Sequence, residues 1–114
     1  MYENKLKRKD QFAYVFKSGK FLSLDTIVIQ YSKRKEKFIS ANPRFGFIAS
    51  KKVGNAVKRN FAKRRLKALE KIILSYGCKK LDYVFVAKKK ILSESFSKIS
   101  IDLKKGLKKT YKQL

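Results

Sequence analysis

The amino-acid sequence predicts a small α+β domain in which helices pack on one sheet. Three runs rich in β-branched and aromatic residues, at positions 26–32, 44–51 and 82–87, are typical of strands. Apolar residues recur at helical spacing near both ends of the chain and between the last two of these runs. The chain has 114 residues, 44% of them hydrophobic, which suits a single domain over residues 1–114 with a modest core.

The N-terminal region predicts a basic arm followed by a short helix. Residues 1–9 contain several Lys and Arg side chains and no apolar run typical of a signal peptide, so we expect a flexible arm. Asp10 is suited to cap a helix that ends at Gly19, because acids favour helix N-termini and glycine favours the residue after the last turn. The apolar residues of this helix share one face: Phe12, Val15 and Phe16.

Two strands are expected next. Alternation in 26–32 predicts two faces, with Ile27, Ile29 and Tyr31 on one and Thr26, Val28, Gln30 and Ser32 on the other. Residues 38–40 either begin a further strand or belong to the loop around Pro43. The run at 44–51 then predicts the next strand of the sheet.

The second half of the chain predicts a long helix, a strand and a final helix. Asn55 is a good N-cap and Gly77 a good terminator, so the long helix spans about 55–76. The strand at 82–87 is almost wholly apolar in its middle, which favours a central place in the sheet. Ser93 or Ser95 can cap the final helix, whose apolar stripe is Phe96, Ile99, Leu103, Leu107 and Tyr111. With a strand at 38–40, the order is α-β-β-β-α-β-α around one small sheet.

Charge is the strongest signal in the composition. The chain has 31 Lys and Arg against 8 Asp and Glu, a net charge of 31 − 8 = +23. A polyanion relieves such self-repulsion through neutralisation and counterion release. No apolar stretch approaches the roughly 18 residues that a membrane-spanning helix needs. We therefore expect a nucleic-acid partner, no membrane partner and a cytoplasmic location.

The residue inventory argues against catalysis by the protein itself. Cys78 is the only cysteine and histidine is absent, which excludes intramolecular disulfides, Cys/His zinc sites and every mechanism with a histidine base. The acidic residues are dispersed, and their spacing indicates no carboxylate metal cluster. We expect no catalytic residue, no metal ligand and no organic cofactor in this chain.

The segment 50–67, SKKVGNAVKRNFAKRRLK, carries the functional signal. On a helix from Asn55, three cations align at i, i+4 and i+8: Arg59, Lys63 and Lys67. Asn60, Arg64 and Lys71 flank them. A solvated charged face is the simpler reading, but the segment holds half of the arginines of the chain, and the arginine fork binds phosphate at two points. This density favours nucleic-acid contact.

Two apolar edges flank the stripe and together could sit on the sheet. One consists of Val57, Phe61, Ala68 and Ile72, and the other of Ala62, Leu66, Leu69 and Ile73. Lys58 and Arg65 fall inside this apolar arc. Either their stems extend past it to reach solvent, or the arc is divided between two contacts.

The same segment resembles the signature of the bacterial ribonuclease P protein family. The run K-K-x-G-N-A-V-x-R-N followed by K-R matches at Lys51, Lys52, Gly54, Asn55, Ala56, Val57, Arg59, Asn60, Lys63 and Arg64. Phe12, Val15, Phe16 and Gly19 resemble the F-x-x-V-F-x-x-G helix of the family, and residues 82–88 resemble its D-Y-V-x-x-A-[RK] strand. Phe61 and Lys67 stand where the family has Arg, and Arg65 stands where it is commonly apolar.

The resemblance implies a fold and two binding surfaces. The fold is a two-layer α/β sandwich of the type seen in domain 2 of ribosomal protein S5, with a left-handed β-α-β crossover around the basic helix. The implied RNA-binding residues are Lys51, Lys52, Asn55, Arg59, Asn60, Lys63, Arg64, Arg65 and Lys67. The implied cleft for a single-stranded 5′ leader is lined by Phe12, Phe16, Gln30, Tyr31 and Ser50. From the residues alone the two phenylalanines fit core packing, whereas the resemblance favours partial exposure of at least one.

The implied function is that of the protein subunit of ribonuclease P. The chain would bind a catalytic RNA and precursor tRNA, and Mg²⁺ held mainly by the RNA would serve the hydrolysis. Isolated protein would bind sulfate or phosphate. Lys88–Lys90 fit either a solvated turn or an RNA contact. The rival hypotheses are a ribosomal or assembly protein with this fold, which would not prefer precursor over mature tRNA, and a self-sufficient nuclease.

Overall fold

The structure is a computed structural model that describes residues 6, 9–36 and 42–111. The elements follow roughly the order that the sequence predicts. In chain order the elements are α1 (Lys9–Ser18), β1 (Lys20–Ser23), β2 (Ile27–Lys33), β3 (Arg44–Ile48), α2 (Ala56–Lys67), α3 (Glu70–Tyr76), β4 (Leu81–Ala87), the 3₁₀ helix η2 (Lys89–Leu92) and α4 (Phe96–Tyr111). None of these helices is both long and apolar enough to cross a membrane, within the residues described.

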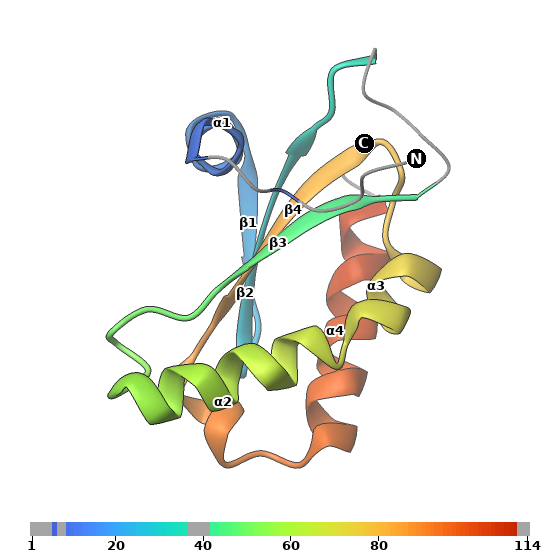
Figure 1. Ribbon diagram of the computed structural model, residues 1–114. Helices are drawn as coiled ribbons and strands as arrows, with labels where there is room; N and C mark the ends of the chain where they lie inside the picture. The colour runs from blue at the N-terminus through green and yellow to red at the C-terminus, as the bar shows by residue number, and fades with distance from the viewer. Residues whose placement is uncertain (1–5, 7–8, 37–41, 112–114) are drawn as a thin grey trace.

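The four strands form one sheet in the order β1-β2-β4-β3 (Figure 1). β2 is antiparallel to β1 and β4, whereas β3 is parallel to β4. All but one of the residues of β4 are buried, which confirms its predicted central place. α2 and α3 connect the parallel pair β3 and β4 and so form a β-α-β crossover, whose handedness stays a prediction.

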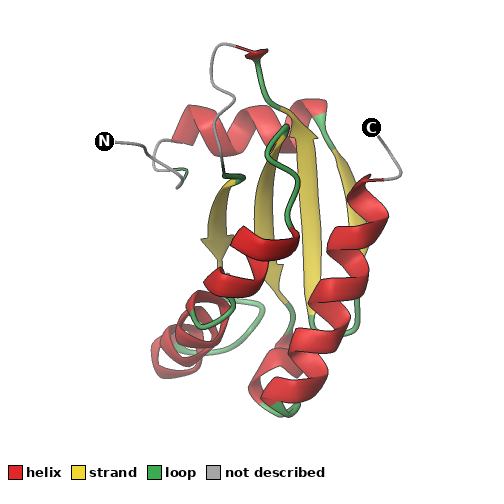
Figure 2. Ribbon diagram, turned by 90° about the vertical axis from the view of Figure 1, so that its right-hand side faces the viewer, coloured by secondary structure: helices red, strands yellow, loops and turns green. Residues whose placement is uncertain are grey.

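Helices lie on both faces of the sheet (Figure 2). On one face α2, α3 and α4 close the main core, to which they contribute Leu66, Ile73 and Leu103. On the other face α1 packs Val15 against Val84 of β4. The predicted α+β sandwich is confirmed, and α1 adds a partial layer on the second face.

The order α-β-β-β-α-β-α is observed when α2 and α3 are counted as the one helix predicted at 55–76, but one of its strands is not the one predicted. β1, with the sequence KFLS, was missed because four mixed residues carry little strand signal of their own. The strand forms because β2 offers a pairing partner, with Lys20 opposite Tyr31 and Ser23 opposite Val28. Residues 38–40, the alternative third strand, lie outside the described residues.

The predicted helix 55–76 is divided into α2 and α3 at Ala68 and Leu69. Here the Leu69 N–H bonds to Leu66 O, three residues back rather than four, which tightens the last turn of α2. Neither glycine nor proline marks the break. Leu69 and Ile73 are both fully buried, and we attribute the break to packing in the core rather than to local sequence.

The N-terminal arm is fixed at Leu6. Its side chain is buried with Val15 and Val84, and its N–H donates to Phe45 O at 2.8 Å. Leu6 thus contacts the sheet and Lys9 begins α1, while the flexibility of the arm stays a prediction. The expectation missed that a single leucine among cations can pack on the sheet.

A buried ion network holds the edge of the sheet where β3 begins. Asp82 accepts two hydrogen bonds from Arg44, at 2.8 and 2.7 Å, and lies 3.5 Å from Arg34 Nε. Arg34 also donates to the backbone carbonyls of Asn42 and Lys79. The side chains of Asp82 and Arg34 are each only 2% exposed, so the carboxylate neutralises charge that water cannot reach.

The end of α4 is joined to β4 through Tyr83. The Tyr83 hydroxyl accepts a hydrogen bond from Cys78 N–H at 2.9 Å and lies 2.8 Å from Thr110 Oγ1. Burial raises the Tyr83 pKa to about 12, although these hydrogen bonds act in the opposite direction. At the other end of α4, Ser95 Oγ caps the helix by accepting from Lys98 N–H, as one of the two predicted caps.

Candidate RNA-binding site

A tight turn sets the start of α2. Gly54 has a φ of 147°, a conformation that favours glycine. Asn55 Oδ1 accepts a hydrogen bond from Lys58 N–H at 3.0 Å, which confirms the predicted N-cap. Val53 is fully buried and anchors the turn to the main core. Lys51 and Lys52 therefore project from a fixed turn, and both are exposed.

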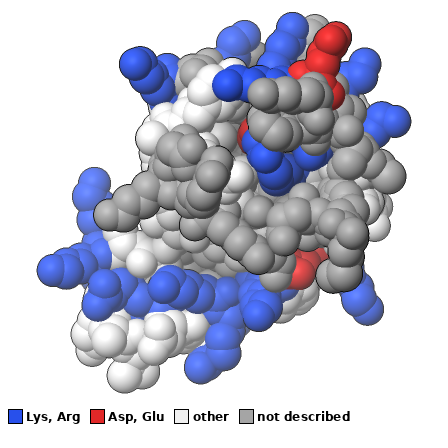
Figure 3. Space-filling model, turned by 45° about the horizontal axis from the view of Figure 1, so that its top comes forward, with Lys and Arg blue, Asp and Glu red and all other residues white. Residues whose placement is uncertain are grey.

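α2 presents its basic residues to solvent. Lys63, Arg64 and Lys67 are exposed and Arg59, next to the buried stripe, is half-buried, whereas Ala62 and Leu66 are fully buried. Figure 3 shows a row of Lys and Arg side chains across the region where Figure 1 places α2. We call the following residues the α2 basic face: Lys51, Lys52, Asn55, Arg59, Asn60, Lys63, Arg64 and Lys67.

Only one of the two predicted apolar edges lies wholly on the core. The edge with Ala62, Leu66, Leu69 and Ile73 is fully buried. In the other edge Ile72 packs against the core, but Val57 is 76% exposed and Phe61 is half-buried, so the expectation that the two edges together sit on the sheet is only partly met. The helix rests on a narrower stripe, which leaves more of its circumference free for a ligand.

The cations of α2 are not neutralised within the fold. In residues 6, 9–36 and 42–111, no carboxylate lies within 4.0 Å of Arg59, Lys63 or Arg64. The ion pairs of this part of the chain instead involve cations from other elements, among them Arg34, Arg44 and Lys90. A phosphate that approaches α2 would therefore contact these cations without displacing a carboxylate.

Arg65 has a different role from its neighbours. Its Nη1 donates hydrogen bonds to the carbonyl oxygens of Ile91, at 3.1 Å, and Glu94. Of the two alternatives for the apolar arc of this helix, the second is observed: one part of the arc contacts the sheet and another part, at Arg65, contacts η2. Because Nη1 is bound to the backbone, Arg65 has a structural role, and its predicted RNA contact stays a prediction.

Phe61 supports both neighbouring arginines. The guanidinium carbon of Arg65 lies 5.0 Å from the Phe61 ring centroid, and that of Arg64 lies 5.7 Å from it. Cation–π attraction at these distances holds a planar guanidinium near the ring. Phe61 stands where the ribonuclease P protein family has an arginine, and here its ring positions the two arginines beside it instead.

The second predicted surface is where α1 crosses the sheet. A Cβ added to Gly46 would lie 2.5 Å from the tip of the Phe12 ring, so glycine is what lets Phe12 lie on β3. Val15 packs on Val84, and Phe16, one residue further, is 43% exposed. The partial exposure expected of at least one phenylalanine is observed.

The two sides of α1 can be told apart. Lys35, which follows β2, lies 5.5 Å from the Tyr14 ring centroid. Tyr14 and Phe16 are about 200° apart on a helix, so Phe16 faces the opposite side, towards the start of β2. Half-buried side chains form the sheet surface there, and with Phe12 and Phe16 we call them the α1 face: Val28, Gln30, Ile48 and Val86.

Two predicted cleft residues do not belong to the α1 face. Tyr31 is only 4% exposed and packs in the main core under α2, α3 and α4, where burial raises its pKa. The alternation of β2 was predicted correctly, but the face that meets α1 is that of Gln30, not Tyr31. Ser50 lies beyond β3, and its Oγ accepts a hydrogen bond from Lys52 N–H at 3.3 Å.

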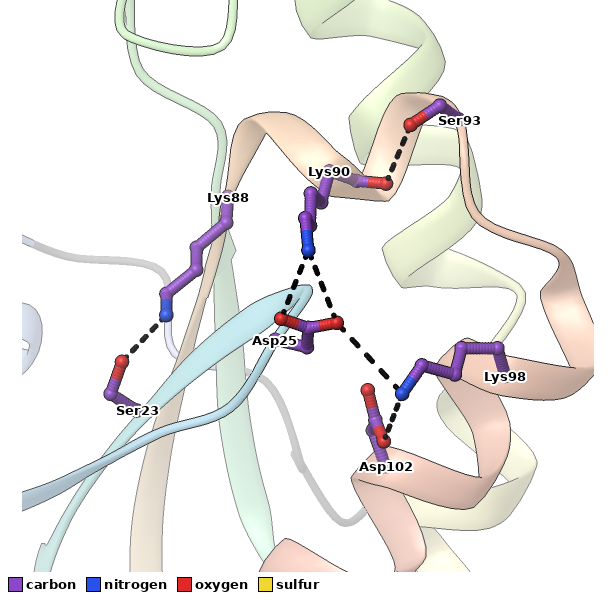
Figure 4. Close-up of polar contacts among 7 residues, drawn as sticks. All are labelled: Ser23, Asp25, Lys88, Lys90, Ser93, Lys98 and Asp102. Atoms are coloured by element: carbon purple, nitrogen blue, oxygen red, sulfur yellow. Dashed lines mark hydrogen bonds and ion pairs between the residues drawn. The ribbon is translucent and has the colours of Figure 1, made fainter.

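The lysines that follow β4 are partly engaged in the fold (Figure 4). Lys88 Nζ donates to Ser23 Oγ at 2.6 Å, and Lys90 Nζ lies 3.3 Å from Asp25. Lys98 of α4 joins the same carboxylate at 3.8 Å. These contacts connect the β1–β2 turn to η2 and α4. Lys89 is exposed, and whether this segment contacts RNA stays a prediction.

The acidic residues do not assemble into a metal site in the described ranges. No group of three or more His, Cys, Asp or Glu side chains comes close enough there to hold an ion. The geometry provides two surfaces suited to binding: a basic helix face and, across the sheet, an aromatic surface.

Known proteins resemble this chain over nearly its whole length. The ribonuclease P family model matches residues 2–111. The ribonuclease P protein component of a Nitratiruptor species is 42% identical over 105 residues, which cover 91% of this chain and 89% of the relative. That of Clostridium beijerinckii is 30% identical over 108 residues, covering 92% and 86%.

Two solved structures have a similar fold. The RNase P protein of Staphylococcus aureus superposes with a TM-score of 0.76 at 26% identity, covering 94% of each chain. The RNase P protein of Thermotoga maritima superposes with a TM-score of 0.77 at 25% identity, covering 92% of this chain and 96% of its own. Both similarities include the elements that carry the α2 basic face and the α1 face.

Proposed function

Because this chain belongs to the ribonuclease P protein family, we propose that it is the protein subunit of a bacterial ribonuclease P. In this role it binds a catalytic RNA and the 5′ leader of precursor tRNA in the cytoplasm. The holoenzyme then cleaves the leader endonucleolytically and leaves the mature 5′ end. The observation that carries the proposal is the α2 basic face, whose cations have no carboxylate partner in the described chain.

The α2 basic face binds the phosphate backbone of the catalytic RNA. Arg64 offers a planar fork for two phosphate oxygens, while Lys63 and Lys67 act as point charges on the same side of the helix. The capped and anchored start of α2 fixes the direction of this row before RNA arrives. Little ordering is then required on binding, which favours affinity.

The α1 face binds the single-stranded leader. Phe16 provides an exposed ring on which a base can stack, and stacking is largely indifferent to sequence. Gln30 lies on the same face of the sheet and can hydrogen-bond to a base edge or a phosphate. A surface of this kind accepts leaders of many sequences, as an enzyme acting on many precursors requires.

Hydrolysis belongs to the RNA in this proposal. Mg²⁺ ions held mainly by the RNA supply an activated water for attack on the phosphodiester. The protein contributes cations that reduce phosphate repulsion where the two RNA molecules meet, and it holds the leader. Fewer Mg²⁺ ions are then needed to screen the same phosphates.

Reconstitution tests the proposed function. Purified protein is added to its cognate catalytic RNA at low Mg²⁺ with a precursor tRNA, and we expect faster cleavage at the mature 5′ end. Absence of any gain would reject the proposal. Equal affinity for precursor and mature tRNA would favour a ribosomal or assembly protein, and Mg²⁺-dependent cleavage by RNA-free protein would favour a nuclease.

A further inference from the structure

Phe21, on the edge strand β1, is the most exposed aromatic residue among those that the structure describes. Its side chain is 68% exposed, against 43% for Phe16. Burying a phenylalanine side chain is favourable, and an exposed apolar side chain on an edge strand favours unwanted association. A ligand that covers this ring would remove the exposed apolar surface and the tendency of the edge strand to associate.

The register of the sheet places Phe21 on the α1 face. Phe21 pairs with Gln30, Gln30 with Val84, and Val84 with Gly46. Residues paired in this way point to the same side of a sheet. This row therefore begins where Phe12 lies on Gly46 and ends at Phe21, three strand spacings or about 14 Å away.

A rigid corner fixes Phe21 relative to Phe16. Gly19 N–H donates to Val15 O at 2.9 Å, and β1 begins at the next residue. A Cβ on Gly19 would lie 2.2 Å from Tyr31 O, so the corner is pressed against β2. The rings of Phe16 and Phe21 are therefore held in a fixed arrangement, because α1 and β1 are joined directly at Gly19.

A cation from the segment after β4 lies beside the strand that carries the ring. Ser23 is two residues after Phe21 and points to the same side, about 7 Å along the strand. Lys88 Nζ is held at 2.6 Å from Ser23 Oγ (Figure 4). A ring for a base and an ammonium for its phosphate are therefore adjacent, a combination typical of single-strand binding.

We propose that Phe21 is a second stacking residue for the single-stranded leader, at the β1 edge of the α1 face. This inference rests on the proposed function, since it assigns a further contact to the same substrate. Bases nearest the cleavage site and bases further along the leader would then stack on different rings. The residue was outside the sequence prediction because β1 itself was missed.

Fluorescence tests this assignment directly, since the chain contains no tryptophan. Phe21→Trp provides a single indole in the holoenzyme, assembled with the cognate catalytic RNA. We expect its emission to be quenched by precursor tRNA and unchanged by mature tRNA. Phe96→Trp is the matched control, because Phe96 is also an exposed phenylalanine but lies on α4, outside the α1 face.

Affinity gives a second readout. We expect Phe21→Leu to weaken binding of precursor tRNA about tenfold, with no change for mature tRNA and an unchanged melting temperature. If wild-type holoenzyme prefers precursor while Phe21→Leu binds it normally and Phe21→Trp emission does not respond, the assignment is wrong and the proposed function stands. If wild-type holoenzyme shows no preference for precursor, both fail.

Discussion

Arg64 and Arg65 are adjacent and chemically identical, yet the fold gives them different tasks. Arg64 points to solvent above Phe61, whereas Arg65 donates to the backbone of η2. A helical wheel gives the direction of both arginine side chains. It does not show which of them meets carbonyl acceptors, because those acceptors belong to residues 26 or more positions away. Roles that depend on long-range partners are not readable from local sequence.

We predict opposite consequences for the two arginines. Arg65→Ala should lower the free energy of unfolding by about 1–3 kcal/mol, because two carbonyls lose a charged donor. Arg64→Ala should leave stability within about 0.5 kcal/mol and weaken RNA binding instead. Urea unfolding of the two variants separates these effects, and equal destabilisation would contradict the assignment.

Asp82 should be the most costly acid to remove. Asp82→Asn removes the charge of the carboxylate that pairs with Arg34 and Arg44, and breaking a buried pair costs about 3–5 kcal/mol. The control is Asp25→Asn, since Asp25 is 45% exposed and its pairs with Lys90 and Lys98 are solvated, with an expected cost below about 1 kcal/mol. Chemical denaturation of both variants provides the comparison.

For the helices and strands, the sequence predicts how side chains alternate along each strand. It does not predict which face of the sheet each helix covers. Ile27, Ile29 and Tyr31 share a face as predicted, yet only the tertiary structure shows that this face lies under α2, α3 and α4. β1 exists because β2 offers an edge, and the break between α2 and α3 follows core packing. In each case the deciding contacts are far away in sequence.

α2 as an element should contribute to RNA affinity through salt-dependent contacts. Arg59→Ala should weaken binding to the catalytic RNA and reduce the slope of log affinity against log salt by about one unit. Filter binding across a salt series measures this slope. Lys105→Ala on α4 is the control, since it removes one exposed charge from another element, and an equal change there would mean that α2 has no special role.

For the whole molecule, the net charge of +23 opposes compaction and makes anions stabilising ligands. Binding of sulfate or phosphate to the folded state should raise the melting temperature by mass action. Thermal unfolding in sodium sulfate, compared with sodium chloride at equal ionic strength, separates specific binding from screening. Identical melting temperatures in the two salts would contradict this expectation.

In the proposed function, two separate surfaces of one small domain bind two different RNA molecules. The most direct measurement is the ratio of precursor to mature tRNA affinity, taken beside catalytic-RNA affinity, in Phe16→Ala and in a Lys63→Ala/Arg64→Ala double variant. Tyr14→Ala, on the other side of α1, is the control for Phe16→Ala. We predict that Phe16→Ala lowers only the ratio and that the double variant lowers only catalytic-RNA affinity. Equal loss of both quantities in both variants would contradict the account.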